Sequence, residues 1–190
     1  MQLIVIDGLD GSGKSTQAKL ICKALKKQQK TICLRVHPEG DNWFGKKARA
    51  YLLLKGKNAH FASAIFYMFD VIRSVSLYSW RRVDYVLFVR YFMGTAYLPA
   101  PLHTVAYNFF SAVLPKSQHM IFLDVKPDVA AARINANRKE LEMFESLASL
   151  KKVRKKALSL TRFDSWVIID SSKPLTQVAY ELKKELLAAA

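Results

Sequence analysis

Short apolar runs alternate with longer segments of helical periodicity along almost the whole chain. The runs are rich in β-branched residues, which is typical of strands buried on both faces of a parallel sheet. They predict strands at residues 2–7, 31–37, 84–89, 119–125 and 166–170. Helical periodicity predicts helices at residues 14–28, 44–55, 60–81, 104–114, 127–159 with an interruption, and 174–189. This alternation predicts an α/β fold with a five-stranded, mostly parallel sheet flanked by helices.

No tract of glycine, serine and proline divides the 190 residues, so we expect one domain over residues 1–190. No apolar run approaches the roughly 18 residues that a membrane-spanning helix needs. The N-terminus opens on the apolar residues 3–6 without the basic segment of a signal peptide. We therefore expect a cytoplasmic protein that does not cross a membrane. Cys22 and Cys33 lack metal-ligand spacing and are expected to be small buried side chains.

The formal net charge of +15 is unusual for a chain of this length. A surface this positive attracts polyanions, which include nucleic acids, anionic membrane surfaces and phosphorylated small molecules. The densest basic run, residues 151–156, is most simply the solvated face of a helix. The charge therefore indicates a polyanionic partner but does not distinguish among these three kinds.

A glycine-rich segment lies between the first predicted strand and the first predicted helix. It has the spacing of a phosphate-binding loop, with glycine, four residues, glycine, lysine and serine. Backbone N–H groups of such a loop, and the N-terminus of the following helix, favour bound phosphate. We expect Lys14 to reach the β- and γ-phosphates of ATP and the Ser15 hydroxyl to bind Mg²⁺. The expected ATP-binding residues are Gly8, Leu9, Asp10, Gly11, Ser12, Gly13, Lys14, Ser15 and Thr16.

A phosphate-binding loop does not by itself distinguish GTPases, ATPases and kinases. No Asn-Lys-x-Asp string, which reads guanine in GTPases, occurs in the sequence. The third predicted strand ends at Arg90 without the acid that motor ATPases usually place there. These observations favour a kinase that transfers phosphate to a small molecule.

The string from Ile6 to Gln17, IDGLDGSGKSTQ, resembles the opening of thymidylate kinases, which carry an acid within the loop. The resemblance extends over nearly the whole chain and implies a P-loop kinase fold with ATP and Mg²⁺ as cofactors. It also implies phosphorylation of a nucleoside monophosphate, most favourably dTMP to dTDP. In such an enzyme Asp10 contacts the 3′-hydroxyl of the acceptor sugar. The resemblance further implies a homodimer packed through the helix of residues 60–81.

Weaker matches to the same family follow in the expected order. They include Pro38-Glu39, Arg90-Tyr91, Ala96-Tyr97 and a helical lid at about residues 134–145. Phe69 and Arg73 share a helix face and resemble the pair that binds thymine in the family. The apolar residues of this face are equally typical of an amphipathic helix packed on the core. By resemblance, the substrate-binding residues are Asp10, Glu39, Phe69, Arg73, Arg90 and Tyr97. The expected catalytic residues are Lys14, Arg90, Arg133 and Arg138.

Two departures from the family predict a weak or retuned kinase. Val89 stands where the family has an acid, and Gly40 stands where many members have an arginine for the acceptor phosphate. Arg49, Lys46 and Lys47 are the candidates to replace that arginine. Two alternatives stay open. One is a nucleoside kinase or other small-molecule P-loop kinase, with Glu39 as the base. The other is a non-catalytic protein that binds nucleotide or, less favoured, nucleic acid.

Overall fold

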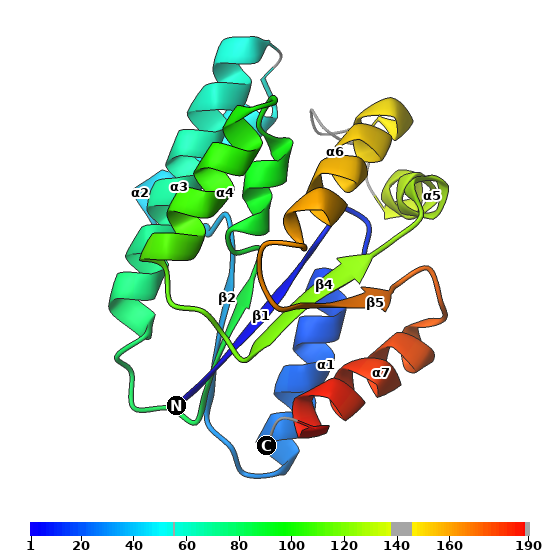
Figure 1. Cartoon of the computed structure of the whole chain (residues 1–190). Helices are drawn as coiled ribbons and strands as arrows, with labels where there is room; N and C mark the ends of the chain where they lie inside the picture. Colours follow the sequence, from blue (N-terminus) through cyan, green and yellow to red (C-terminus); the bar gives the residue numbers. More distant parts are fainter. Residues whose placement is uncertain (55, 138–145, 189–190) are drawn as a thin grey trace.

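The computed structural model describes residues 1–54, 56–137 and 146–188. Five strands in these ranges form one sheet in the order β2-β3-β1-β4-β5 (Figure 1). All neighbouring strands pair in parallel. The strands are β1 (Gln2–Gly8), β2 (Ile32–Val36), β3 (Tyr85–Val89), β4 (His119–Asp124) and β5 (Trp166–Asp170). The predicted α/β class and five-stranded parallel sheet are confirmed.

Helices cover both faces of the sheet. Helices α1 (Lys14–Lys27) and α7 (Leu175–Ala188) pack on one face, where they lie side by side in Figure 1. The opposite face is covered by α3 (Lys57–Tyr78), the 3-10 helix η1 (Met93–Tyr97), α4 (Leu102–Val113), α5 (Pro127–Asn137) and α6 (Leu147–Leu160). Helix α2 (Trp43–Leu52) packs against α3. The predicted helices are all present, with α5 and α6 as the two parts of the interrupted one, whereas η1 was not predicted.

The central strand β1 explains why the apolar runs are continuous. It lies between β3 and β4, and Ile6 pairs with Val89 on one side and Ile121 on the other. Both faces of β1 are covered by helices, so Val5 and Ile6 are fully buried on opposite faces. The loop that follows β1 is therefore attached to a central, buried strand of the sheet.

Helix α3 is the single helix in the described chain that is long and apolar enough to cross a membrane, over Phe61–Tyr78 with a mean hydropathy of 1.2. Its apolar runs are short, because Asp70, Arg73 and several serines interrupt them. One such helix is weak evidence for a membrane span, because core helices of soluble proteins pass the same test. Hydrogen bonds of a buried side chain attach the middle of α3 to the segment that follows β2. Asp70 is fully buried and accepts hydrogen bonds from the amide of Glu39 and from Asn42 Nδ2.

The loops that carry candidate chemistry lie at one edge of the sheet. Because all strands run in parallel, their carboxyl ends share that edge, and ligands of such sheets bind in the crevice there. The phosphate-binding loop follows β1, His37 follows β2 and Arg90 follows β3. Residues far apart in the sequence thus meet around one site.

Candidate active site

The loop after β1 has the backbone geometry of an anion cradle. Gly13 has a φ of 83°, and a Cβ built on it would meet nothing within 4 Å, so open space lies above the loop. Gly8 has a φ of 147°, and a Cβ there would lie 2.4 Å from the carbonyl oxygen of Leu123. A side chain at either position would strain the loop. The two glycines are therefore required by conformation and by close approach, respectively.

Lys14 begins α1 and turns back over the loop. Its Nζ donates hydrogen bonds to the carbonyl oxygens of Gly8, at 2.8 Å, and Leu9, at 2.5 Å. The Ser12 hydroxyl is buried without a hydrogen-bond partner among the described residues. Ser15 and Thr16 are exposed in the first turn of α1, where their N–H groups have no helical acceptor. An orphaned hydroxyl, a lysine and open helix-terminal donors fit a triphosphate.

Asp10 connects the loop to the carboxyl end of β3 and to η1. Its carboxylate accepts hydrogen bonds from Arg90 Nη2 at 2.5 Å and from the Tyr97 hydroxyl at 2.8 Å. Burial alone would raise the pKa of Asp10, but the charges of Arg90 and Lys14 and these hydrogen bonds hold the pKa well below its usual value. The predicted site residues Asp10, Arg90 and Tyr97 are therefore in direct contact, with Asp10 ionised.

The backbone of Arg90 is left-handed, with a φ of 60°. This conformation costs a residue with a side chain roughly 1–2 kcal/mol. Asp7 supports the segment that follows, because its carboxylate accepts hydrogen bonds from the amides of Gly8, Tyr91 and Met93 at 2.9, 2.8 and 3.2 Å. These hydrogen bonds give Asp7 a structural role at the end of β1.

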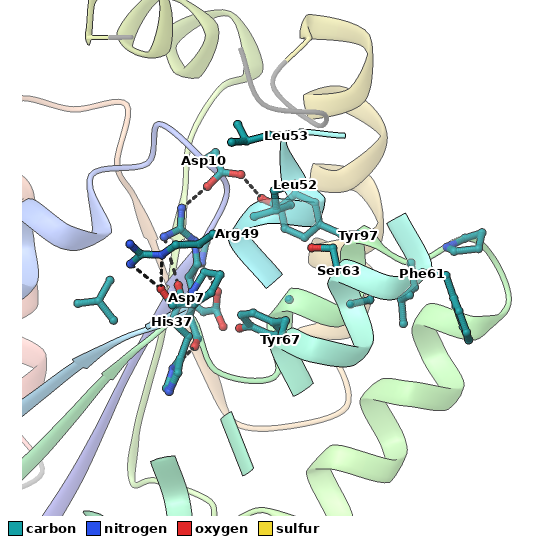
Figure 2. A pocket seen from close by; sticks show the side chains of 18 residues that line it. Asp7, Asp10, His37, Arg49, Leu52, Leu53, Phe61, Ser63, Tyr67 and Tyr97 are labelled. Atoms are coloured by element: carbon teal, nitrogen blue, oxygen red, sulfur yellow. Dashed lines mark hydrogen bonds and ion pairs between the residues drawn. The ribbon is translucent and has the colours of Figure 1, made fainter. Parts of the chain in front are cut away.

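A cavity of about 770 Å³ opens beside the loop. Figure 2 shows how side chains from β1, α2, α3 and η1 converge on it. Its lining includes the polar side chains of Asp7, Asp10, Arg90, Tyr97 and Ser63 and the apolar side chains of Leu52, Leu53 and Phe61. Tyr67 forms part of the wall, and its hydroxyl donates to the Tyr91 carbonyl at 2.6 Å. The volume and the mixed lining suit a small ligand with one charged end.

Three predicted substrate-binding residues lie outside this cavity. Glu39 Oε1 accepts a hydrogen bond from the amide of Val36 at 2.7 Å and lies 3.4 Å from Arg35 Nε. Phe69 is 49% exposed and stacks on Phe44, and Arg73 lies 4.0 Å from Asp41. The face of α3 that lines the cavity carries Ser63, Ala64 and Tyr67 instead. In the sequence, the one feature that could have identified this face of α3 is its small residues, which precede a tyrosine.

Arg49 on α2 is the basic residue that lines the cavity in place of the arginine absent at Gly40. Its Nε and Nη2 donate to the Pro38 carbonyl at 2.9 and 2.6 Å. A Cβ built on Gly40 would lie 3.3 Å from Arg49 Nη1, so the guanidinium covers the face of the glycine. Lys46 and Lys47 are exposed and do not line the cavity. Of the three candidates to replace that arginine, Arg49 is therefore the one that lines the cavity.

Arg133 on α5 lies on the other side of the loop from the cavity-lining Arg90. Its Nη1 donates to the carbonyl oxygens of Gly11 at 3.3 Å and Ser171 at 2.9 Å. This position suits contact with the nucleotide that the loop holds. Arg138 lies outside the described residues, and so do residues 138–145 of the predicted lid. Residues 134–137 form the end of α5.

His37 is fully buried beside Arg90, with Nδ1 at 2.9 Å from the Arg90 carbonyl oxygen. Burial lowers its pKa from 6.5 to about 4. Between these values the unfolded chain binds a proton that the folded protein does not. The free energy of unfolding is therefore expected to fall as the pH drops from 6.5 to about 4, by about 1.4 kcal/mol per pH unit. Urea unfolding across this range should show a smaller decrease for His37→Asn, and equal slopes would contradict the assignment.

The protein has two adjoining ligand sites. The glycines and Lys14 form a site for the phosphates of a nucleotide, and the cavity beside them has room for a second ligand. A phosphate loop beside an acceptor-sized cavity defines the class of P-loop phosphotransferases. Comparison with known proteins narrows the class. The profile of the family described as thymidylate kinase matches residues 6–182, and the chain belongs to this family. It is therefore a phosphotransferase that acts on a nucleoside monophosphate.

Curated relatives agree with this assignment over nearly their whole length. A probable thymidylate kinase of Metallosphaera sedula is 30% identical, and the match covers 100% of this chain and 96% of the relative. A probable thymidylate kinase of Archaeoglobus fulgidus is 31% identical, with 96% and 93% covered. The solved thymidylate kinase of Candida albicans matches with a TM-score of 0.78 at 22% identity, covering 98% of this chain and 91% of that one. That structural match supports the P-loop kinase fold.

Proposed function

We propose that the protein transfers the γ-phosphoryl group of ATP to dTMP, forming ADP and dTDP. The observation that carries the proposal is the Asp10–Arg90 pair, which joins the phosphate loop to the acceptor-sized cavity. Family membership supports ATP as the donor, and the names of the relatives favour dTMP as the acceptor. One kinase domain over residues 1–190 in the cytoplasm fits this function.

Lys14 and the loop amides hold the β- and γ-phosphates of the donor, and Arg133 contacts the nucleotide from α5. The Ser15 hydroxyl would help to hold Mg²⁺, which would supply further charge neutralisation at the phosphates.

The acceptor lies in the cavity with its phosphate toward Arg90 and Arg49 and its base between the aromatic walls formed by Phe61 and Tyr67. Asp10 oxygens retain lone pairs that accept a hydrogen bond from the sugar 3′-hydroxyl. The attacking oxygen belongs to the acceptor phosphate, which is already ionised near neutral pH. The protein therefore needs to position the two phosphates and neutralise charge, and it needs no general base.

The rival nucleoside kinase needs a carboxylate base for a neutral 5′-hydroxyl. Glu39, the residue expected for that role, accepts a hydrogen bond from the Val36 amide and is not itself among the residues that line the cavity. Asp10 is a weak base because Arg90 and Lys14 keep its pKa low. These placements favour a monophosphate acceptor.

The test is ADP release from ATP and Mg²⁺ with thymidine, dTMP, dUMP, UMP, CMP, AMP and GMP as separate acceptors. Turnover that is fastest with dTMP supports the proposal, and faster turnover with another monophosphate would change the acceptor. Turnover with thymidine alone would establish the nucleoside kinase. ATP binding without turnover on any acceptor would favour a non-catalytic nucleotide-binding protein, for which the charge of +15 makes nucleic acid the next ligand to test.

Replacing Val89 with aspartate is expected to raise kcat about tenfold, because the new carboxylate organises Mg²⁺ and its waters. Val89 is fully buried at the end of β3, so the charge should also lower the free energy of unfolding by about 1–3 kcal/mol. Steady-state rates across a Mg²⁺ titration measure the first effect, and Val89→Asn is the uncharged control. An unchanged or lower kcat for Val89→Asp would argue against a missing magnesium acid.

We also propose a homodimer that forms through the outer face of α2 and α3. Neighbouring rings there are 5.2–5.5 Å apart between centroids, and we call this set the aromatic chain: Tyr51, Phe66, Trp43, Phe44 and Phe69. Trp43 is 58% exposed and Phe69 is 49% exposed. A contiguous exposed aromatic patch of this kind is typical of a protein interface. Phe66 and Phe69 of the aromatic chain lie on α3, the helix that the family resemblance assigned to the dimer, and its other three rings lie on α2.

Phe69→Asp is therefore expected to convert the dimer to a monomer, raising the dimer dissociation constant at least about tenfold. Light scattering after size-exclusion chromatography measures the mass. Phe109→Asp is the matched control, because Phe109 is similarly exposed, at 57%, but lies on α4 outside the aromatic chain. Equal behaviour of the two variants would exclude the aromatic chain as the interface.

A further inference from the structure

The peptide group between Arg90 and Tyr91 is held from both sides by buried side chains. Its carbonyl accepts a hydrogen bond from His37 Nδ1 at 2.9 Å, and its N–H donates to Asp7 Oδ2 at 2.8 Å. His37 follows β2 and Asp7 belongs to β1, which are the two neighbours of β3 in the sheet. Figure 2 shows Asp7 and His37 near each other where the strands end. The peptide that leaves β3 is thus fixed by both flanking strands.

The contact defines which nitrogen of His37 carries the proton. A carbonyl oxygen only accepts, so Nδ1 is the donor and Nε2 is unprotonated. Nε2 is buried without a hydrogen-bond partner within the described ranges. The ring stacks on Phe88 with centroids 5.6 Å apart and meets Tyr67 edge-on at 6.5 Å. An apolar side chain would fill this space without an unpaired nitrogen, so packing alone does not explain a histidine here.

The backbone and side-chain geometry of Arg90 indicates the role of His37. Arg90 keeps a φ of 60° while its Nη2 reaches Asp10 and its Nη1 lies 3.4 Å from the His37 carbonyl oxygen. In return, the His37 amide donates to the Val89 carbonyl at 3.0 Å. Rotation of the peptide after Arg90 would break the bonds to His37 and Asp7 together. The left-handed backbone and the direction of the guanidinium therefore depend on these two side chains.

We propose that His37, acting with Asp7, is a positioning residue that fixes the Arg90–Tyr91 peptide and so aims the Arg90 guanidinium at the acceptor phosphate. The catalytic part of this inference rests on the proposed kinase function. The structural part, a clamped peptide with a Nδ1-protonated histidine, does not.

The test compares His37→Leu with His37→Asn, whose amide nitrogen can replace Nδ1 as the donor. We expect His37→Leu to lower kcat/KM for dTMP about 10- to 100-fold, because small displacements of a positioning group are costly. ATP affinity, measured by calorimetry without acceptor, should be unchanged. His37→Asn should recover most of the lost activity. His119→Leu is the matched control, since His119 is also buried and has an unpartnered ring nitrogen but lies on β4.

The proposal is overturned if His37→Leu and His119→Leu have equal kinetic effects, or if His37→Asn is as impaired as His37→Leu. A separate readout covers the case in which the wild-type protein phosphorylates no acceptor. Nitrogen-15 NMR should show a Nδ1-protonated His37, and hydrogen exchange of the Tyr91 amide should accelerate in His37→Leu but not in His119→Leu. Slow exchange in both variants, or a Nε2-protonated His37, would refute the clamp independently of catalysis.

Discussion

Replacing Lys14 with methionine is expected to lower kcat about 1,000-fold, an effect of the size seen when a preorganised charge at transferring phosphate is removed. Methionine nearly preserves the length of the side chain but cannot neutralise phosphate oxygens. Lys14 is buried, and its Nζ bonds the Gly8 and Leu9 carbonyls, so the loop also loses two hydrogen bonds. Coupled-assay rates with dTMP at saturating ATP measure the loss.

Lys19→Met is the matched control, because Lys19 lies on the same helix and is exposed. It should keep wild-type kcat and KM. The melting temperatures of both variants establish that they are folded. A Lys14→Met enzyme that retained more than about a tenth of the wild-type kcat would mean that transfer does not depend on this loop.

Arg90→Lys is expected to lower kcat/KM for dTMP about 100- to 1,000-fold although the positive charge is preserved. Arg90 bonds Asp10 through one nitrogen and faces the cavity, and a planar fork is what allows one side chain to contact both Asp10 and phosphate. A lysine has one nitrogen and cannot make both contacts in fixed directions. ATP affinity should change little, because Lys14 and the loop amides hold the donor.

The control for this substitution is Arg81→Lys. Arg81 stacks on Tyr78 after α3, remote from the carboxyl edge of the sheet, so its replacement should leave the kinetics unchanged. If Arg90→Lys loses ATP affinity and dTMP affinity to the same extent, Arg90 serves the donor and not the acceptor.

The fold could be predicted from the sequence because its signals are local. Both faces of β1, β3 and β4 are covered by helices, so apolar runs mark them within about two residues. Only η1 was missed. Its five residues, Met93–Tyr97, are too few to show a helical period, and a 3-10 turn is held by the surrounding contacts.

In the candidate site, too, the residues marked by a local pattern could be predicted and those placed by long-range packing could not. Residues 8–16 are contiguous, so their spacing alone predicts the loop. The acceptor side depends on which face of α3 meets the cavity. That helix is apolar on several sides, so periodicity could not separate Tyr67 from Phe69. Arg49 and His37 reach the site only because α2 packs against α3 and β2 pairs with β3, and no local sequence pattern predicts such long-range contacts.

The Asp10–Arg90 pair has a thermodynamic consequence for the order of binding. Asp10 belongs to the donor loop and Arg90 to the acceptor wall, so a ligand that shifts the loop also changes the environment of the acceptor arginine. Linkage requires such an effect to be reciprocal: if ATP alters the affinity for the acceptor by some factor, the acceptor alters the affinity for ATP by the same factor. The Asp10 carboxylate is thus a direct contact between the two substrate sites, and a coupling that passes through it would act equally in both directions.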